Sequence, residues 1–133
     1  MNRLFVSAVF AVTLLAALFL SGYALAADQK AFDAGAFATL QGADKPILID
    51  VRADWCPTCK RQAPIISSLM AQPEFKNFTV LEVDFDSQPV VLRQFHATQQ
   101  STLIVYRGKS ELGRSTGDTS KEGIAALLRK ANS

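Results

Sequence analysis

The sequence predicts a single α/β domain with a central mixed β-sheet and helices on both faces. Three short apolar runs, at residues 46–51, 78–85 and 102–106, are typical of buried strands and alternate with segments of helical spacing. The third run is followed by a glycine-containing turn and a second β-rich segment, which indicates a hairpin. Alternating units that end in a hairpin imply a sheet with both parallel and antiparallel neighbours.

The first half of the predicted domain contains two helices and one strand. Residues 28–40 place apolar side chains at helical spacing, and Gly42 marks the end of that helix. Residues 46–51 form the first strand. The next helix begins at Cys56 and Cys59 and extends to about residue 71, with Pro64 inside it, where we expect a kink.

The second half continues this alternation. Residues 78–85 form a core strand, and residues 86–89 resemble the N-cap and first turn of a helix that extends to about residue 95. Strands at 102–106 and 111–115 flank a turn. Thr119 and Glu122 fit a capping box for a last helix, whose apolar face carries Ile124, Leu127 and Leu128. The predicted order is α-β-α-β-α-β-β-α.

Residues 1–26 have the pattern of an export signal. Arg3 provides a positive start, residues 4–20 are almost wholly apolar, and Ala24-Leu25-Ala26 forms a small-x-small cleavage site. An uncleaved membrane anchor is the alternative, because the apolar stretch is long enough to span a bilayer. We expect cleavage and a periplasmic protein comprising residues 27–133. That part has 13 basic and 12 acidic side chains once Arg3 is removed, a balance that does not indicate nucleic-acid binding.

Cys56 and Cys59 are the only cysteines, and their spacing favours chemistry over structural support. At the start of a helix both thiols lie on one face of the first turn, where they can form a disulfide. The free N–H groups of the helix N-terminus favour an exposed thiolate at Cys56. A disulfide that closes so short a loop stabilises the fold only weakly. The pair is therefore suited to thiol–disulfide exchange, in which one sulfur attacks and the other resolves the mixed disulfide.

Together these features resemble the thioredoxin family over essentially all of residues 27–133. The resemblance rests on Trp-Cys-Pro-Thr-Cys-Lys at 55–60, on Asp50 six residues before Cys56, on Pro64 eight residues after Cys56, and on the element order. Residues 53–56 also resemble the thioredoxin domains of periplasmic thiol:disulfide interchange reductases.

The resemblance implies roles for individual residues. Cys56 would be the nucleophile, Cys59 the resolving thiol and Asp50 a buried acid that exchanges protons with Cys59, although a strand-end carboxylate facing water is the alternative for Asp50. Burial would raise the pKa of Asp50. The expected substrate contacts are Trp55, Pro57, Ser101 and Thr102, although Trp55 could instead be a core aromatic.

Two positions depart from the family pattern. Ser101 stands where most members have a cis-proline, so we predict a trans peptide bond before it, because a non-proline cis bond costs roughly 3 kcal/mol. Glu82 stands where many members have a lysine that pairs with the buried aspartate. If Asp50 and Glu82 both point inward, one of their pKa values should rise.

The leading hypothesis is an extracytoplasmic thiol–disulfide oxidoreductase that reduces or exchanges disulfides in exported proteins. It would be a monomer without a cofactor, re-reduced by a membrane-bound redox partner. One alternative is a copper- or zinc-binding module that uses the two cysteines, with His96 as a further ligand and the missing cis-proline leaving the cysteines open to metal. The other is a redox-inert binding domain with a purely structural disulfide.

Overall fold

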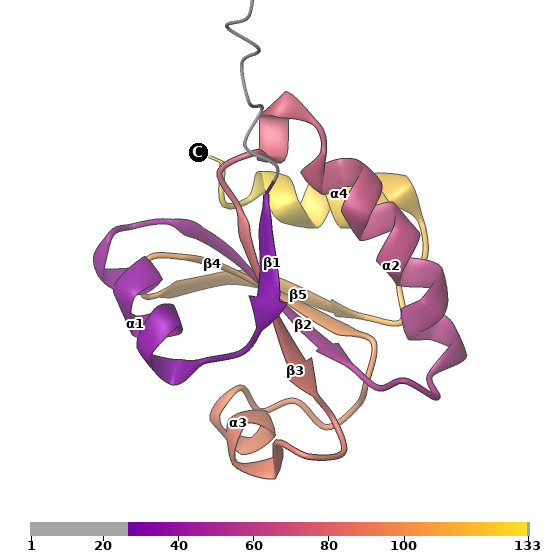
Figure 1. Ribbon diagram of the computed structural model, residues 1–133. Helices are drawn as coiled ribbons and strands as arrows, with labels where there is room; N and C mark the ends of the chain where they lie inside the picture. Colours follow the sequence, from indigo (N-terminus) through magenta and orange to yellow (C-terminus); the bar gives the residue numbers. More distant parts are fainter. Residues whose placement is uncertain (1–26, 133) are drawn as a thin grey trace, which may run out of the picture.

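The computed structural model describes residues 27–132, so the predicted export signal at 1–26 lies outside the described residues. Within these residues, five strands and four α-helices follow one another, with one short 3-10 helix. Figure 1 shows their arrangement. Their bounds are β1 Asp28–Ala31, α1 Ala34–Gly42, β2 Pro46–Arg52, α2 Pro57–Met70, η1 Pro73–Phe75, β3 Thr79–Asp84, α3 Pro89–Gln94, β4 Thr102–Arg107, β5 Ser110–Thr116 and α4 Lys121–Arg129. Among residues 27–132, no helix combines the length and apolar character needed to cross a membrane.

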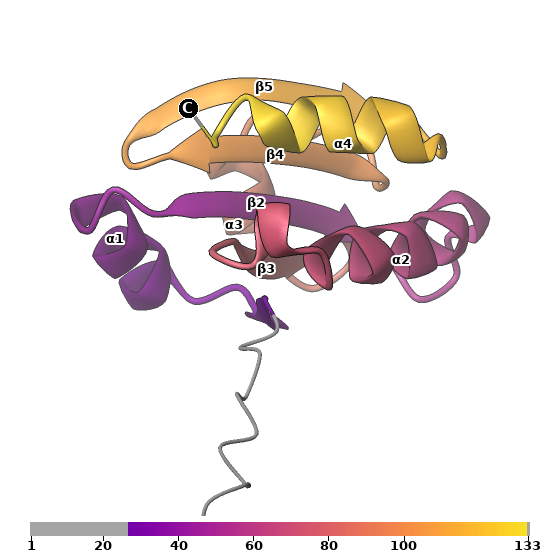
Figure 2. The ribbon, with the colours of Figure 1, turned by 90° about the horizontal axis from the view of Figure 1, so that it is seen from above.

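The strands form one mixed sheet in the order β1-β3-β2-β4-β5. β1 and β2 both pair in parallel with β3, whereas β4 is antiparallel to β2 and β5 is antiparallel to β4. Figure 2 shows the resulting stack from β5 through β4 and β2 to β3. The predicted mixed sheet with a terminal hairpin is therefore confirmed.

Helices cover both faces of the sheet. The side chains of a strand alternate between its two faces, and here both faces carry apolar side chains that pack against helices. Leu48 of β2 packs in a buried cluster with residues of α2 and α4, including Ile66 and Leu128. Ile47 and Ile49, on the other face, pack against α1 and α3 in a second cluster. The face covered by α2 and α4 is the one that carries the residues of the candidate site.

The prediction of a helix over residues 28–40 is wrong at its start. Asp28–Ala31 forms β1, an edge strand whose side chains are all exposed, and the helix α1 begins only at Ala34. Backbone pairing with β3 holds this strand, and hydrophobic periodicity carries no signal of such pairing. Asp33 is the N-cap, and its carboxylate accepts a hydrogen bond from the backbone N–H of Ala36 at 2.7 Å.

The predicted capping box of the last helix is displaced by one residue. The N-cap of α4 is Ser120, whose hydroxyl accepts a hydrogen bond from the backbone N–H of Gly123 at 3.1 Å. Asp118 accepts hydrogen bonds from both the backbone N–H and the hydroxyl of Ser120, which fixes the cap. Thr119 therefore lies outside the cap. In α2, Pro64 lies inside the helix as predicted, and the helix continues through it to Met70.

Candidate active site

The two cysteines form the N-terminal turn of α2. Cys56 is the N-cap residue and Pro57 takes the first helical position, where its missing N–H costs nothing. The sulfur of Cys56 accepts a hydrogen bond from the backbone N–H of Cys59 at 3.1 Å. The two residues are joined by a disulfide, with their Cα atoms 5.3 Å apart. A thiolate formed at Cys56 would keep this donor and the positive end of the helix, both of which stabilise the charge.

In this oxidised state both cysteines are buried, contrary to the exposed sulfur expected from the sequence. Cys56 is 1% exposed and Cys59 is 5% exposed, and both pack in a small cluster with Ala53 and Phe85. The sequence could not show this covering, because it comes from the β2–α2 connection and the end of β3. A partner thiol must therefore displace some of this covering before it reaches Cys56.

Trp55 is the exposed apolar residue beside the disulfide. It is 55% exposed, which excludes the alternative of a core aromatic. Its indole N–H donates a hydrogen bond to the carboxylate of Asp86, at 2.8 Å, in the connection that follows β3. That contact fixes the ring at the surface, and the neighbouring Pro57 is exposed as well. Lys60 is an exposed residue of α2.

Asp50 is buried beneath the cysteine helix. It lies on β2 with Leu48, on the face that α2 covers, and is only 6% exposed, which excludes the alternative of a solvent-facing carboxylate. Burial is the main reason that the pKa of Asp50 rises from 3.8 to about 6; the negative charge of Glu82 raises it further, and Arg52 lowers it. A carboxyl group with this pKa can both accept and release a proton near neutral pH.

Glu82 and Arg52 form an ion pair next to Asp50. Asp50 and Glu82 are register partners on the parallel strands β2 and β3, and Arg52 lies two residues after Asp50 on the same face. The guanidinium of Arg52 is 3.1 Å from Glu82 Oε1, which also accepts a hydrogen bond from Gln29 Nε2 at 2.5 Å. Glu82 therefore accepts hydrogen bonds from Arg52 and Gln29, and the positive charge of Arg52 partly balances its negative charge. Glu82 was predicted from the sequence to lie near Asp50, whereas Arg52 was not.

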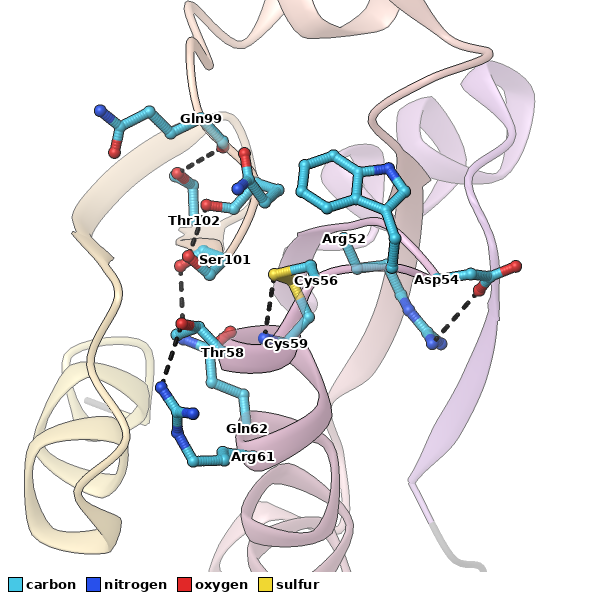
Figure 3. The surroundings of a disulfide bond; sticks show 12 residues. Arg52, Asp54, Cys56, Thr58, Cys59, Arg61, Gln62, Gln99, Ser101 and Thr102 are labelled. Carbon is cyan, nitrogen blue, oxygen red and sulfur yellow. Dashed lines mark hydrogen bonds and ion pairs between the residues drawn. A yellow bond between two sulfur atoms is a disulfide. The ribbon is translucent and has the colours of Figure 1, made fainter.

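The loop before β4 faces the disulfide from the side opposite Arg52 and Asp54 (Figure 3). All peptide bonds within residues 27–132 are trans, including the bond before Ser101, as predicted. Ser101 is buried and has a φ of 59°, the left-handed conformation that side chains other than glycine seldom adopt. The hydroxyl of Thr102 donates to the carbonyl of Gln99 at 2.8 Å and lies 3.0 Å from the hydroxyl of Thr116.

Gln62 connects this loop to the cysteine helix, a role that the sequence did not predict. Its side-chain amide donates hydrogen bonds to the carbonyl of Asp118 at 2.8 Å and to that of Ser101 at 3.3 Å. It occupies the buried stripe of α2 with Cys59, Ile66 and Leu69. A polar residue in an otherwise apolar helical stripe was the signal that could have identified it.

His96 does not join Cys56 and Cys59 in a three-residue metal site within residues 27–132. His96 lies in the segment that follows α3. Within residues 27–132, no three His, Cys, Asp or Glu side chains lie where they could hold a metal ion together.

The thioredoxin family model matches residues 26–130, almost the whole described domain. The thioredoxin of Chlamydia trachomatis serovar D is 36% identical over 84 residues, which are 63% of this chain and 80% of that protein. The chain belongs to the thioredoxin family. It is also 35% identical over 97 residues (73% of the chain) to the bifunctional thioredoxin reductase/thioredoxin of Mycobacterium leprae, but it spans only 20% of that longer protein.

Among solved structures, Trxlp from Edwardsiella tarda EIB202 has the same fold, with a TM-score of 0.74 and 42% sequence identity. The match covers 76% of this chain and 98% of Trxlp. Membership of the family and the Cys56–Cys59 disulfide at the start of α2 identify the chain as a thioredoxin-type thiol–disulfide oxidoreductase that acts on protein disulfides.

Proposed function

We propose that this thioredoxin-family protein works outside the cytoplasm, where it reduces or exchanges disulfides in exported proteins and is re-reduced by a membrane-bound partner. The observation that carries the chemistry is the Cys56–Cys59 pair at the N-terminus of α2, together with the buried carboxyl group of Asp50 on the sheet face that α2 covers. The location is supported by the export-signal pattern of residues 1–26. We further propose that the protein acts as a monomer.

The reaction begins with the reduced pair. The Cys56 thiolate attacks one sulfur of the substrate disulfide, forming a mixed disulfide and releasing the other substrate sulfur as a thiolate, which takes up a proton. Cys59 then loses its proton and attacks the Cys56 sulfur. The second substrate sulfur leaves and is protonated. Two electrons have passed from the cysteine pair to the substrate, and the Cys56–Cys59 disulfide has formed.

Asp50 is suited to the proton transfer in the second step. Because its pKa is about 6, it is mostly ionised at neutral pH and can accept the Cys59 proton, yet it is basic enough to hold that proton transiently. An exposed aspartate with a pKa near 3.8 would be a much weaker base.

The chemistry is tested with residues 27–133 in an insulin-reduction assay with dithiothreitol as electron donor. Cys56→Ser should abolish turnover, and Cys59→Ser should accumulate mixed disulfides because the resolving thiol is missing. Wild-type protein that neither reduces insulin nor exchanges with a dithiol would contradict the proposal and leave the redox-inert domain as the explanation.

The direction of transfer is tested by the reduction potential of the cysteine pair in glutathione and dithiothreitol buffers. A value near roughly −270 mV indicates a reductant, whereas a value near roughly −120 mV indicates an oxidant and contradicts the reductase assignment. The location is tested by expressing residues 1–133 and measuring the mass of the protein recovered from the extracytoplasmic fraction. A mature chain that begins at Ala27 supports export with cleavage, and a full-length cytoplasmic protein contradicts it.

A further inference from the structure

Gln62 lies where the cysteine helix, the loop before β4 and the β5–α4 connection meet. It follows Cys59 by one helical turn, so its position relative to the disulfide is set by the rigid backbone of α2. Its amide nitrogen reaches one carbonyl on each of the other two segments, Ser101 and Asp118. Figure 3 shows Gln62 and Ser101 on the same side of the cysteine turn.

The orientation of the Gln62 amide follows from its partners. Both neighbours are carbonyl oxygens, which only accept, so the nitrogen and its two hydrogens must face them. The side-chain oxygen is then left without a hydrogen-bond partner, although the residue is 1% exposed. Burying an unpartnered acceptor is unfavourable. A methionine or leucine in the same stripe would avoid that cost but would remove both hydrogen bonds, so what glutamine adds at this position is the link between the two segments.

The loop that Gln62 holds needs such support. Ser101 combines a trans peptide bond with a left-handed backbone, a conformation that persists only when the surroundings fix it. Its carbonyl accepts hydrogen bonds from Gln62 and from the backbone N–H of Gly117, the latter at 2.9 Å. Its hydroxyl donates to the carbonyl of Gln100 at 2.5 Å. Proline cannot adopt the φ of Ser101, so a proline ring could not fix the loop in this conformation. The conformation depends on hydrogen bonds instead.

We propose that Gln62 is a positioning residue that holds the loop at residues 99–102 against the disulfide, so that the backbone of a protein substrate docks in register with Cys56. The inference rests on thiol–disulfide exchange at Cys56–Cys59 and is independent of where in the cell the protein works. Gln62 takes no part in the electron transfer itself. Its contribution is to the binding of extended polypeptide beside the disulfide, and a small disulfide with no polypeptide backbone does not use it.

The test compares two substrates in the variant Gln62→Met, which keeps the length of the side chain and removes both hydrogen bonds. Insulin presents a polypeptide backbone, whereas Ellman's reagent is a small aromatic disulfide without one. We expect KM for insulin to rise roughly five- to tenfold, the effect of one or two lost hydrogen bonds. The kcat for insulin, the rate with Ellman's reagent and the midpoint potential should not change. Gln94→Met, the same substitution on the exposed surface of α3, is the matched control and should behave as wild type.

Amide hydrogen exchange at Gly117 gives a second readout that does not depend on activity. The Gly117 N–H donates to the Ser101 carbonyl, so a loosened loop should exchange it faster in Gln62→Met than in wild type. Unchanged exchange, or an unchanged KM for insulin, would overturn the proposal. Equal losses on both substrates with a shifted potential would also overturn it, because they would show that Gln62 supports the disulfide and not the docking loop. Wild-type protein inactive on both substrates would instead refute the proposed function, and Gly117 exchange would still decide the role of Gln62.

Discussion

Replacing Asp50 by asparagine is expected to stabilise the oxidised protein above pH 7 and to have little effect on its stability below pH 4. Asparagine has nearly the same shape as aspartate, but it never has to be charged inside the protein. The burial that raises the pKa of Asp50 to about 6 makes its ionised form unfavourable in the native state. The substitution removes that unfavourable ionisation.

The sign and size follow from the two pKa values. Native Asp50 binds its proton more tightly than the unfolded chain does, so the wild type loses stability as pH rises from 3.8 to about 6. The shift of about two units corresponds to about 3 kcal/mol. Asp50→Asn should therefore be more stable than wild type by about 3 kcal/mol at pH 8, with the difference shrinking toward zero as pH falls through this range.

Urea denaturation of the disulfide form at 25 °C, between pH 4 and pH 8, measures this difference directly. Asp28→Asn, which removes an exposed carboxylate on the edge strand, is the control and should show only a small effect. A stability difference between Asp50→Asn and wild type that does not change with pH would refute the reasoning, because it would show that Asp50 ionises as easily in the native as in the unfolded protein.

Further substitutions test the charged neighbours of Asp50, the left-handed backbone at Ser101 and the N-cap of α4 at Ser120. Arg52→Met should raise the pH midpoint of Asp50, measured by NMR of its carboxyl carbon, because the substitution removes the positive charge that lowers this pKa. Glu82→Gln should lower the same midpoint, because it removes a negative charge. A midpoint that neither substitution changes would exclude this coupling. Ser101→Pro should destabilise the fold by roughly 1–3 kcal/mol in urea denaturation, because proline cannot adopt a φ of 59°; equal stability would show that the loop tolerates a second conformation. Ser120→Ala should cost about 1 kcal/mol through loss of the N-cap of α4, and an unchanged urea midpoint would mean that water replaces the cap.

The parts of the site that could be predicted from sequence are those that depend on short-range patterns. The spacing of Cys56 and Cys59 at a helix start and the position of Asp50 on an apolar strand are local features, and the structure places them on α2 and β2 as expected. The burial of the two cysteines was not expected. The order of strands and helices from β2 onward was also visible, because each apolar run is bounded by turn residues.

The parts that were missed depend on contacts between distant segments. The strand β1 is held by backbone pairing with β3 and leaves its side chains exposed, so its sequence carries no strand periodicity. Gln62 contacts carbonyl groups 39 and 56 residues away. Arg52 and Glu82 meet only because β2 and β3 are neighbours in register. Local patterns contain no information on which distant groups will become neighbours.

The parallel pairing of β1 has a practical consequence for attaching the domain to anything else. β1 begins at Asp28, level with Thr79 and Ile47 at the start of β3 and β2, whereas the cysteines follow the opposite end of β2. A polypeptide joined ahead of Ala27 is therefore attached at the end of the sheet opposite the disulfide. A tether at that point, whether a membrane anchor, an affinity tag or a bead, would hold the protein with its reactive end directed away from the support.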